Sequence, residues 1–140
     1  MSFDWPIRVY YEDTDAGGVV YHARYLHFME RARTEWLRHA GFDQRALAHE
    51  AGVIFAVRDL QIDFHRPARL DDVLRVHTEV AEQRRVSFSF DQKIFTDAAA
   101  DAELLCHARV KVACLNAQSF APQAIPESIS SALAAGAPPL

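Results

Sequence analysis

Apolar side chains in the first third of the chain recur at helical intervals. From residue 21 onward they lie three, four and seven positions apart, at Tyr21, Tyr25, Phe28, Met29, Ala32, Trp36, Leu37 and Ala40. This spacing predicts one long helix from about Val20 to Ala40 with a single buried stripe. The glycine of "AGF" supplies its stop, and residues 43–52 predict a second, short helix with Asp43 as N-cap.

The period changes from helical to alternating after Gly52. Apolar and polar residues alternate in four successive segments, which are 53–65, 73–83, 86–95 and 103–116. Residues 7–11, β-branched and aromatic, predict a short strand before the long helix. The order strand, long helix, short helix and four strands predicts an α+β fold. In it, a curved five-stranded antiparallel sheet wraps one long central helix.

Size and composition narrow the possible functions. The 140 residues, half of them hydrophobic, suit a single domain over 1–140 with a peripheral tail from about residue 127. A formal net charge of -4 argues against a nucleic-acid partner. No apolar run reaches the roughly 18 residues of a membrane span, and the chain begins without a targeting pattern. We therefore expect a cytoplasmic protein, with Cys106 and Cys114 reduced.

The stretch "DTDAGG" (residues 13–18) raises the question of chemistry. Turn and cap formation is the commonest role for such residues before a helix. A calcium loop does not fit, because Gly17 and Arg24 occupy ligand positions, and phosphate-loop and nucleophile-elbow patterns are missing from the sequence. The functional interpretation that remains is a carboxylate located at the N-terminus of a helix. Backbone N–H groups there polarise a carbonyl, and the neighbouring acid acts as base or nucleophile.

Three stretches carry a resemblance to a known family: "YYEDTDAGGVVYHARYLHFMERARTEWL" from Tyr10, "ARLDDVL" from Ala68 and "AIPESI" from Ala124. Together they resemble hotdog-fold enzymes of the 4-hydroxybenzoyl-CoA thioesterase class. The nearest type within this class is the acyl-CoA thioesterase encoded with the Tol-Pal system (the YbgC type). The resemblance implies the hotdog fold and hydrolysis of an acyl-CoA thioester to free acid and CoA.

The resemblance also implies the site residues. The family's catalytic carboxylate matches Asp15, and the family's tyrosine on the preceding strand matches Tyr11. The family's histidine after "VVY" matches His22, and the resemblance implies that the backbone N–H near His22 polarises the thioester carbonyl. We expect substrate contacts at Gly17, Gly18, Val20 and Tyr25; the two glycines would allow close approach to the backbone. For Tyr25 an acyl-pocket role and plain packing remain equally open. The histidines lack paired ligand spacing, so we expect neither a metal nor another cofactor.

Two other functions and the assembly remain open. The first is a non-catalytic module that binds acyl thioesters or acyl-carrier protein, and the second is an interaction subunit near the cell-envelope machinery. Residues 53–64 are rich in strand formers and predict edge-to-edge pairing in a two-fold homodimer; the resemblance implies that dimers often form a homotetramer. Basic residues that could meet the phosphates of CoA are Arg58, Arg66, Arg69, Arg84, Arg85, Lys93, Arg109 and Lys111.

Overall fold

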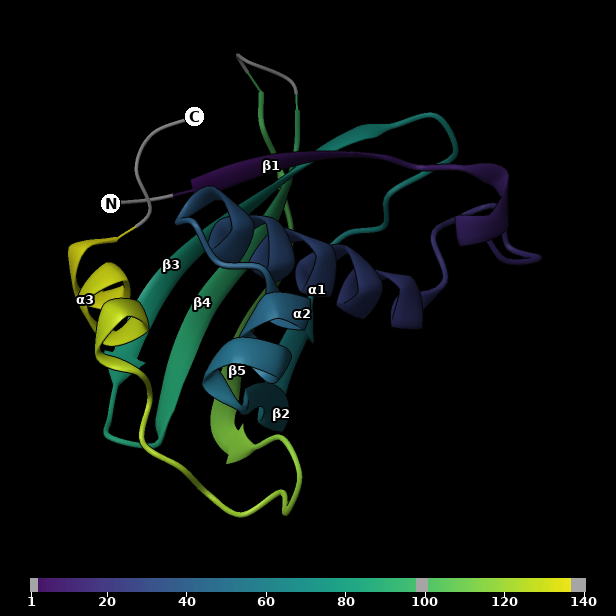
Figure 1. Ribbon diagram of the computed structural model, residues 1–140. Coiled ribbons are helices and arrows are strands. Elements are labelled where there is room, and N and C mark those ends of the chain that lie inside the picture. Colours follow the sequence, from purple (N-terminus) through teal and green to yellow (C-terminus); the bar gives the residue numbers. More distant parts are fainter. Residues whose placement is uncertain (1–2, 98–100, 137–140) are drawn as a thin grey trace.

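A curved antiparallel sheet forms one layer of the protein, and a long helix crosses its concave face (Figure 1). The computed structural model describes residues 3–97 and 101–136. The five strands lie in the order β1 (Phe3–Arg8), β3 (Val73–Gln83), β4 (Ser87–Thr96), β5 (Leu104–Asn116) and β2 (Val53–Phe64). All neighbouring strands are antiparallel. The predicted α+β class and the five-stranded sheet are confirmed.

The central helix α1 spans His22–His39. Its buried side chains include Phe28, Met29 and Trp36, each fully inaccessible to solvent, as the stripe predicted. The Trp36 ring packs edge-on against Phe90 of β4, with centroids 5.7 Å apart. Tyr21 was expected in the buried stripe, but it precedes the helix and is 46% exposed. The stripe thus seats α1 on the sheet and leaves its first turn at one end of the molecule.

The first strand begins and ends earlier than predicted. Its register with β3 runs from Phe3 opposite Thr78 to Arg8 opposite Val73, the first residue of β3. The pairing of β1 with β3 ends at Arg8. Tyr11, which was predicted to end the strand, instead starts a 3₁₀ turn, Tyr11–Asp13. The chain therefore leaves the sheet before it reaches the candidate loop.

The second helical segment agrees with its predicted cap. The Asp43 side chain accepts a hydrogen bond of 2.8 Å from the N–H of Arg45. It stands before α2 (Gln44–Ala46), which continues into a single π-helical turn, Leu47–Ala51. Gly52 then takes a φ of +68°, which glycine adopts without strain, and leads into β2.

A bulge in β2 changes which residues face the core. The register against β5 shifts between Val57 and Asp59. Before the shift Val53 is fully buried, and after it Leu60 and Ile62 pack against the core. An extra residue in one strand inverts the inward and outward alternation beyond it, which explains why the alternation along this segment reads cleanly only from Leu60.

The C-terminal helix α3 (Glu127–Ala135) contributes to the core. Ile129 is fully buried and Leu133 is 2% exposed, so the segment that the sequence placed at the periphery supplies core side chains. The Gln83 side chain at the end of β3 donates to the Ser130 carbonyl at 2.9 Å. Residues 137–140, the end of the tail predicted to be peripheral, lie outside the described residues. Within the described part of the chain, no helix is long and apolar enough to cross a membrane.

Candidate active site

Asp13 organises the loop that precedes α1. Its side chain is almost fully buried, at 3% exposure, and accepts the N–H of Tyr10 at 2.8 Å. Its backbone carbonyl accepts the N–H of Tyr21 at 2.9 Å, and the guanidinium of Arg24 lies 3.8 Å from its carboxylate. Asp13 therefore holds the two ends of the loop together.

Asp15 lies on the exposed part of the same loop, in a tight turn. Its Oδ1 accepts the N–H of Gly17 at 2.8 Å, and its own N–H donates to the Val19 carbonyl at 2.9 Å. Gly18 takes a φ of +81°, a conformation that favours glycine. A Cβ at Gly17 would stand 3.2 Å from Asp15 Oδ1. The glycine pair thus permits both the turn and the position of the carboxylate.

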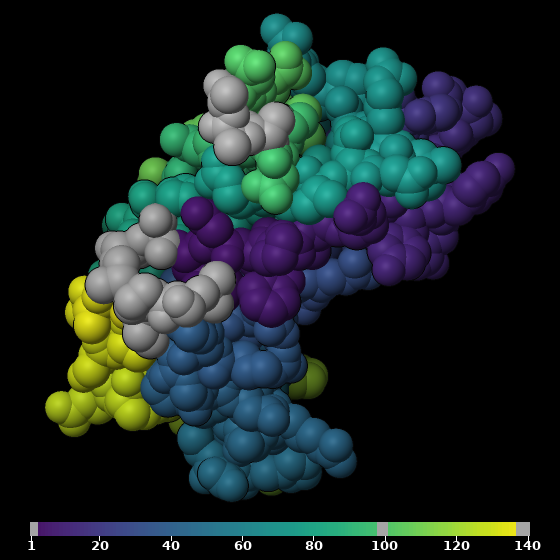
Figure 2. Space-filling model, turned by 90° about the horizontal axis from the view of Figure 1, so that it is seen from above, coloured from purple at the N-terminus to yellow at the C-terminus, as the bar shows by residue number. Residues whose placement is uncertain are grey.

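The loop is tied to a segment distant in sequence, residues 65–69. The N–H of Val20 donates to the Ala68 carbonyl at 2.9 Å, and Val19 forms an isolated bridge with Arg69. From the other side, Tyr25 Oη accepts the N–H of Ala68 at 2.9 Å. In Figures 1 and 2 the purple-to-indigo loop and the teal segment lie beside each other at one end of the molecule.

A pocket of about 260 Å³ opens at the start of α1, between these two segments. It is lined by Val20, His22, Tyr25, Phe64, His65, Arg66 and Pro67. The Phe64 ring, 49% exposed, lies 5.7 Å from the Tyr25 ring and 6.4 Å from the His22 ring between centroids. Three of the expected site residues therefore share one pocket.

The first turn of α1 borders this pocket through His22. The first N–H groups of a helix have no acceptor four residues earlier, and they carry the positive end of the helix dipole. A carbonyl group bound in the pocket would thus meet hydrogen-bond donors that the helix does not use internally.

Burial raises the pKa of the Tyr25 hydroxyl above its usual value. The hydrogen bond from Ala68 opposes this shift, and the nearby charges of Asp72 and Asp15 add to it. Tyr25 consequently stays protonated at neutral pH. Tyr25 is buried in the core and also lines the pocket, and its role toward an acyl group stays a prediction.

Tyr11 is placed differently from the other expected site residues. Its side chain is 82% exposed and lines a separate hollow with Arg8, Val9, Tyr10, Leu70 and Asp71. Within one chain, the structure does not bring Tyr11 into the pocket that contains His22.

Of the pocket wall formed by residues 64–67, the sequence singled out only Arg66, as one of the basic residues that could meet the phosphates of CoA. These residues end one predicted strand and begin its connector, with no local pattern that marks them. The hydrogen bond between Tyr25 and Ala68, 43 positions apart, and the ring contacts of Phe64 with His22 and Tyr25 hold this wall against the helix. A contact of this kind leaves no periodic signal in a single sequence.

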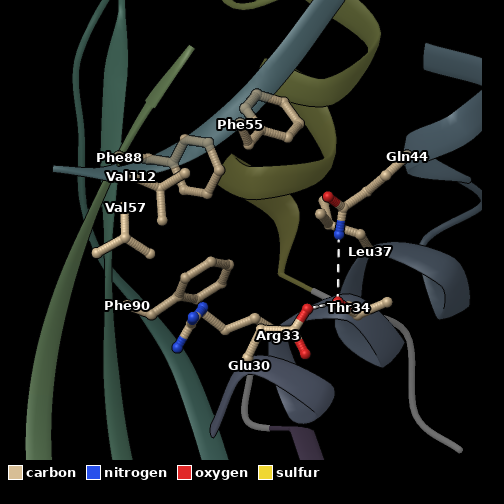
Figure 3. A pocket seen from close by; sticks show the side chains of 10 residues that line it. All are labelled: Glu30, Arg33, Thr34, Leu37, Gln44, Phe55, Val57, Phe88, Phe90 and Val112. Atoms are coloured by element: carbon tan, nitrogen blue, oxygen red, sulfur yellow. Dashed lines mark hydrogen bonds between the residues drawn. The ribbon is translucent and has the colours of Figure 1, made fainter. Parts of the chain in front are cut away.

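A second hollow lies between α1 and the sheet, away from the candidate loop (Figure 3). The buried guanidinium of Arg33 lies next to the Phe90 ring and donates to Gln92 Oε1 at 2.9 Å. Glu30, which lines the same hollow, accepts the Thr34 hydroxyl at 3.1 Å. Burial lowers the pKa of Arg33, and the charge of Glu30 opposes that shift. None of the expected site residues lines this hollow.

Within residues 3–97 and 101–136, no group of three or more His, Cys, Asp or Glu side chains could hold a metal ion. Both cysteines are buried and free, and burial raises the pKa of Cys106 to about 12, so its thiol stays protonated.

Comparison with known proteins places this geometry in context. Residues 17–103 match the Thioesterase superfamily. The acyl-CoA thioester hydrolase YbgC of Escherichia coli O6:H1 is 51% identical over 127 residues, covering 91% of this chain and 92% of that protein. The acyl-CoA thioesterase YbgC of Haemophilus influenzae is 48% identical over 131 residues, with 94% and 93% covered. A probable thioesterase from Bartonella henselae has a similar structure, with a TM-score of 0.82, 37% identity, and coverage of 90% of this chain and 100% of that one.

Proposed function

Since this chain belongs to the Thioesterase superfamily, we propose that it hydrolyses acyl-CoA thioesters to free acid and CoA, with Asp15 as the catalytic carboxylate. One observation carries the assignment of Asp15: its carboxylate is exposed on the loop that leads directly into the first turn of α1. That turn borders a pocket able to receive a thioester group. A carboxylate on the loop before a helix, followed by free N–H groups in the first turn, is a combination that supports acyl transfer.

The reaction follows from this arrangement. The thioester carbonyl oxygen accepts hydrogen bonds from the first-turn N–H groups, which makes its carbon more electrophilic. As a base, Asp15 takes a proton from water while the water oxygen bonds to that carbon. The tetrahedral intermediate then collapses, the carbon–sulfur bond breaks, and the CoA sulfur leaves with a proton. As a nucleophile, Asp15 instead forms a mixed anhydride, which water hydrolyses in a second step.

The other proposed residues support this chemistry. Gly17 and Gly18 shape the turn around the carboxylate, and Val20, His22 and Tyr25 line the pocket. His22 is proposed to hydrogen-bond the substrate, which its place in the pocket lining supports. Tyr11, on the same loop as Asp15, is proposed to assist from outside this pocket. Loss of either the His22 imidazole or the Tyr11 hydroxyl should cost less activity than loss of the Asp15 carboxylate.

Asp15→Asn tests the assignment. Asparagine keeps the shape and can accept the Gly17 N–H, but it is neither a base nor a carboxylate nucleophile. On the best substrate of a CoA-thioester panel, kcat should fall about a hundredfold or more, with circular dichroism unchanged. The matched control is Asp97→Asn, an exposed acid beyond β4, which should leave kcat unaltered.

Two outcomes would redirect the proposal. Near wild-type kcat in Asp15→Asn would show that another group performs the chemistry. A wild-type protein that binds acyl thioesters or acyl-carrier protein without hydrolysing either would favour the binding-module alternative. Comparing acyl-CoA with acyl-carrier-protein substrates by kcat/KM identifies the preferred carrier. Rapid quench and mass spectrometry distinguish the two mechanisms, because only the nucleophilic one acylates Asp15.

A further inference from the structure

The hydroxyl of Tyr25 has hydrogen-bonding capacity that the fold does not use. A tyrosine hydroxyl carries one donated hydrogen and can accept hydrogen bonds. Tyr25 Oη accepts the N–H of Ala68 at 2.9 Å, and this bond leaves the hydroxyl hydrogen available. Among residues 3–97 and 101–136, the structure provides no acceptor for that hydrogen. Because Tyr25 is only 3% exposed, an unpaired donor at this position is costly.

The surroundings of the ring restrict where this hydrogen can point. The Tyr25 ring is held edge-on to Phe28 at 6.1 Å and tilted against Phe64 at 5.7 Å between centroids. The bond from Ala68 fixes one side of the oxygen, so the remaining freedom is rotation about the carbon–oxygen bond. Tyr25 lines the pocket at the first turn of α1, and the charge of Asp15 reaches its hydroxyl electrostatically. A group bound in the pocket beside this ring would supply the acceptor that the described residues do not give this hydrogen.

We propose that the Tyr25 hydroxyl donates a hydrogen bond to the carbonyl oxygen of the bound thioester and is a catalytic residue of the site. This inference rests on the proposed function. As water or Asp15 adds to the carbonyl carbon, negative charge grows on that oxygen, and Tyr25 stabilises it beside the helix N–H groups. No proton is transferred from Tyr25; when the carbon–sulfur bond breaks, the electron pair on that oxygen re-forms the C=O double bond and the electron pair of the broken bond leaves with sulfur.

The proposed role of Tyr25 also gives a function to the Ala68 N–H, which donates to a side chain and not to a neighbouring strand. The N–H of Ala68 occupies one side of the Tyr25 oxygen, so the hydroxyl hydrogen points away from it, while the Ala68 carbonyl accepts from Val20 at the start of the pocket. One residue of the connector thus aligns the hydroxyl donor with the first turn of α1. A donor held in advance stabilises the transition state without paying for reorientation.

Tyr25→Phe is the first test, because phenylalanine preserves the ring packing. Loss of one oxyanion donor should lower kcat about 100-fold while KM changes by less than about threefold. The substitution also removes the acceptor for Ala68, so hydrogen exchange at the Ala68 amide is measured alongside. Tyr10→Phe is the matched control, since it removes a hydroxyl from an exposed ring that does not line the pocket; its kcat should stay within about threefold of wild type.

A ring-fluorinated tyrosine at position 25 separates donation from structure. Its oxygen still accepts the N–H of Ala68, but its pKa is lower, so it loses the hydrogen within the measurable pH range. We expect kcat to fall as the fluorinated hydroxyl ionises, with protection of the Ala68 amide retained. The same amino acid at the exposed Tyr10 should leave the pH profile unchanged. If the pH profile of kcat with fluorinated tyrosine at position 25 is the same as that of wild type, the inference is wrong.

A binding experiment keeps the result distinct from the fate of the proposed function. The probe is an acyl-CoA analogue in which a ¹³C-labelled ketone replaces the thioester, so that no hydrolysis is possible. Hydrogen bonding to the ketone should move its carbonyl resonance downfield in the wild-type complex, and less so with Tyr25→Phe. If the protein hydrolyses no thioester but this difference appears, hydrolysis fails and Tyr25 remains the carbonyl donor. Equal resonances in both complexes would disprove the donor role even in an active enzyme.

Discussion

At the scale of single residues, the two glycines after Asp15, Gly17 and Gly18, each exclude a side chain for a different physical reason. At Gly18 a Cβ would meet nothing within 4 Å, but the φ of +81° disfavours any other residue. At Gly17 φ imposes no such restriction, yet a Cβ would crowd Asp15 Oδ1 at 3.2 Å. Backbone strain therefore governs one position and the placement of the carboxylate governs the other.

This difference predicts opposite results for two alanine variants. Gly18→Ala should destabilise the protein by about 1 kcal/mol, the cost of a left-handed backbone in an L-residue. Gly17→Ala should leave stability almost unchanged and lower kcat, because the methyl group displaces the Asp15 carboxylate. Urea unfolding and steady-state kinetics measure the two effects. The interpretation fails if Gly17→Ala unfolds more readily than Gly18→Ala while retaining full kcat.

At the scale of elements, a buried polar cluster joins α1 to the sheet. Gln92 of β4 donates to the Met29 carbonyl and to the Thr78 hydroxyl, each at 3.0 Å, and accepts from Arg33 at 2.9 Å. Gln92 and Thr78 are completely buried. Both residues lie on the inward, otherwise apolar face of the strands. The Gln92 side chain thus forms hydrogen bonds with both the Met29 carbonyl and the Arg33 guanidinium of α1.

Removing Gln92 should be costly because Arg33 would lose its partner. Gln92→Leu leaves a buried guanidinium and a buried hydroxyl without that hydrogen bond, and should reduce the free energy of unfolding by about 2–3 kcal/mol. Arg33→Met removes the charge itself and should cost less. Urea denaturation of both variants gives the comparison. Equal stability of Gln92→Leu and wild type would mean that the cluster does not anchor α1.

At the scale of the whole molecule, β2 is an edge strand with apolar side chains left uncovered. It pairs with β5 on one side, and Val57 and Phe64 are 50% and 49% exposed. The second hollow is lined partly by Val57 and Phe55 of this strand. Open strand edges of this kind invite pairing with another chain. The edge position agrees with the expected two-fold dimer, which stays a prediction.

The dimer prediction is tested by a charge on this edge. Val57→Glu should convert the dimer to a monomer in sedimentation velocity, because a carboxylate would be desolvated in the pairing. Phe120→Glu, on an exposed side chain outside β2, should remain a dimer. Activity should decline with dissociation if the site draws residues from two chains. A fully active monomer would rule out a composite site, and a wild-type monomer would refute the dimer.

The periodicity of the sequence determined the elements and most of the core. Helical spacing located α1 to within two residues, and alternation identified the inward residues of β3, β4 and β5, such as Leu74, Phe90 and Val110. These patterns are readable because each element must bury one face, and that requirement acts between neighbours in sequence. The loop around Asp15 was recognised by its motif, and the structure adds the hydrogen bonds that hold it.

Only the tertiary structure decided what surrounds that loop. The pocket wall at residues 64–67, the bond between Tyr25 and Ala68, and the placement of Tyr11 outside the pocket arise from contacts between distant segments. The bulge at Arg58 and the strand order β1-β3-β4-β5-β2 arise in the same way. Such contacts depend on how the finished elements pack, and no local periodicity encodes that packing. The sequence by itself therefore determined which elements form and which loop carries Asp15. The packing of those elements decided which side chains line the pocket beside that loop.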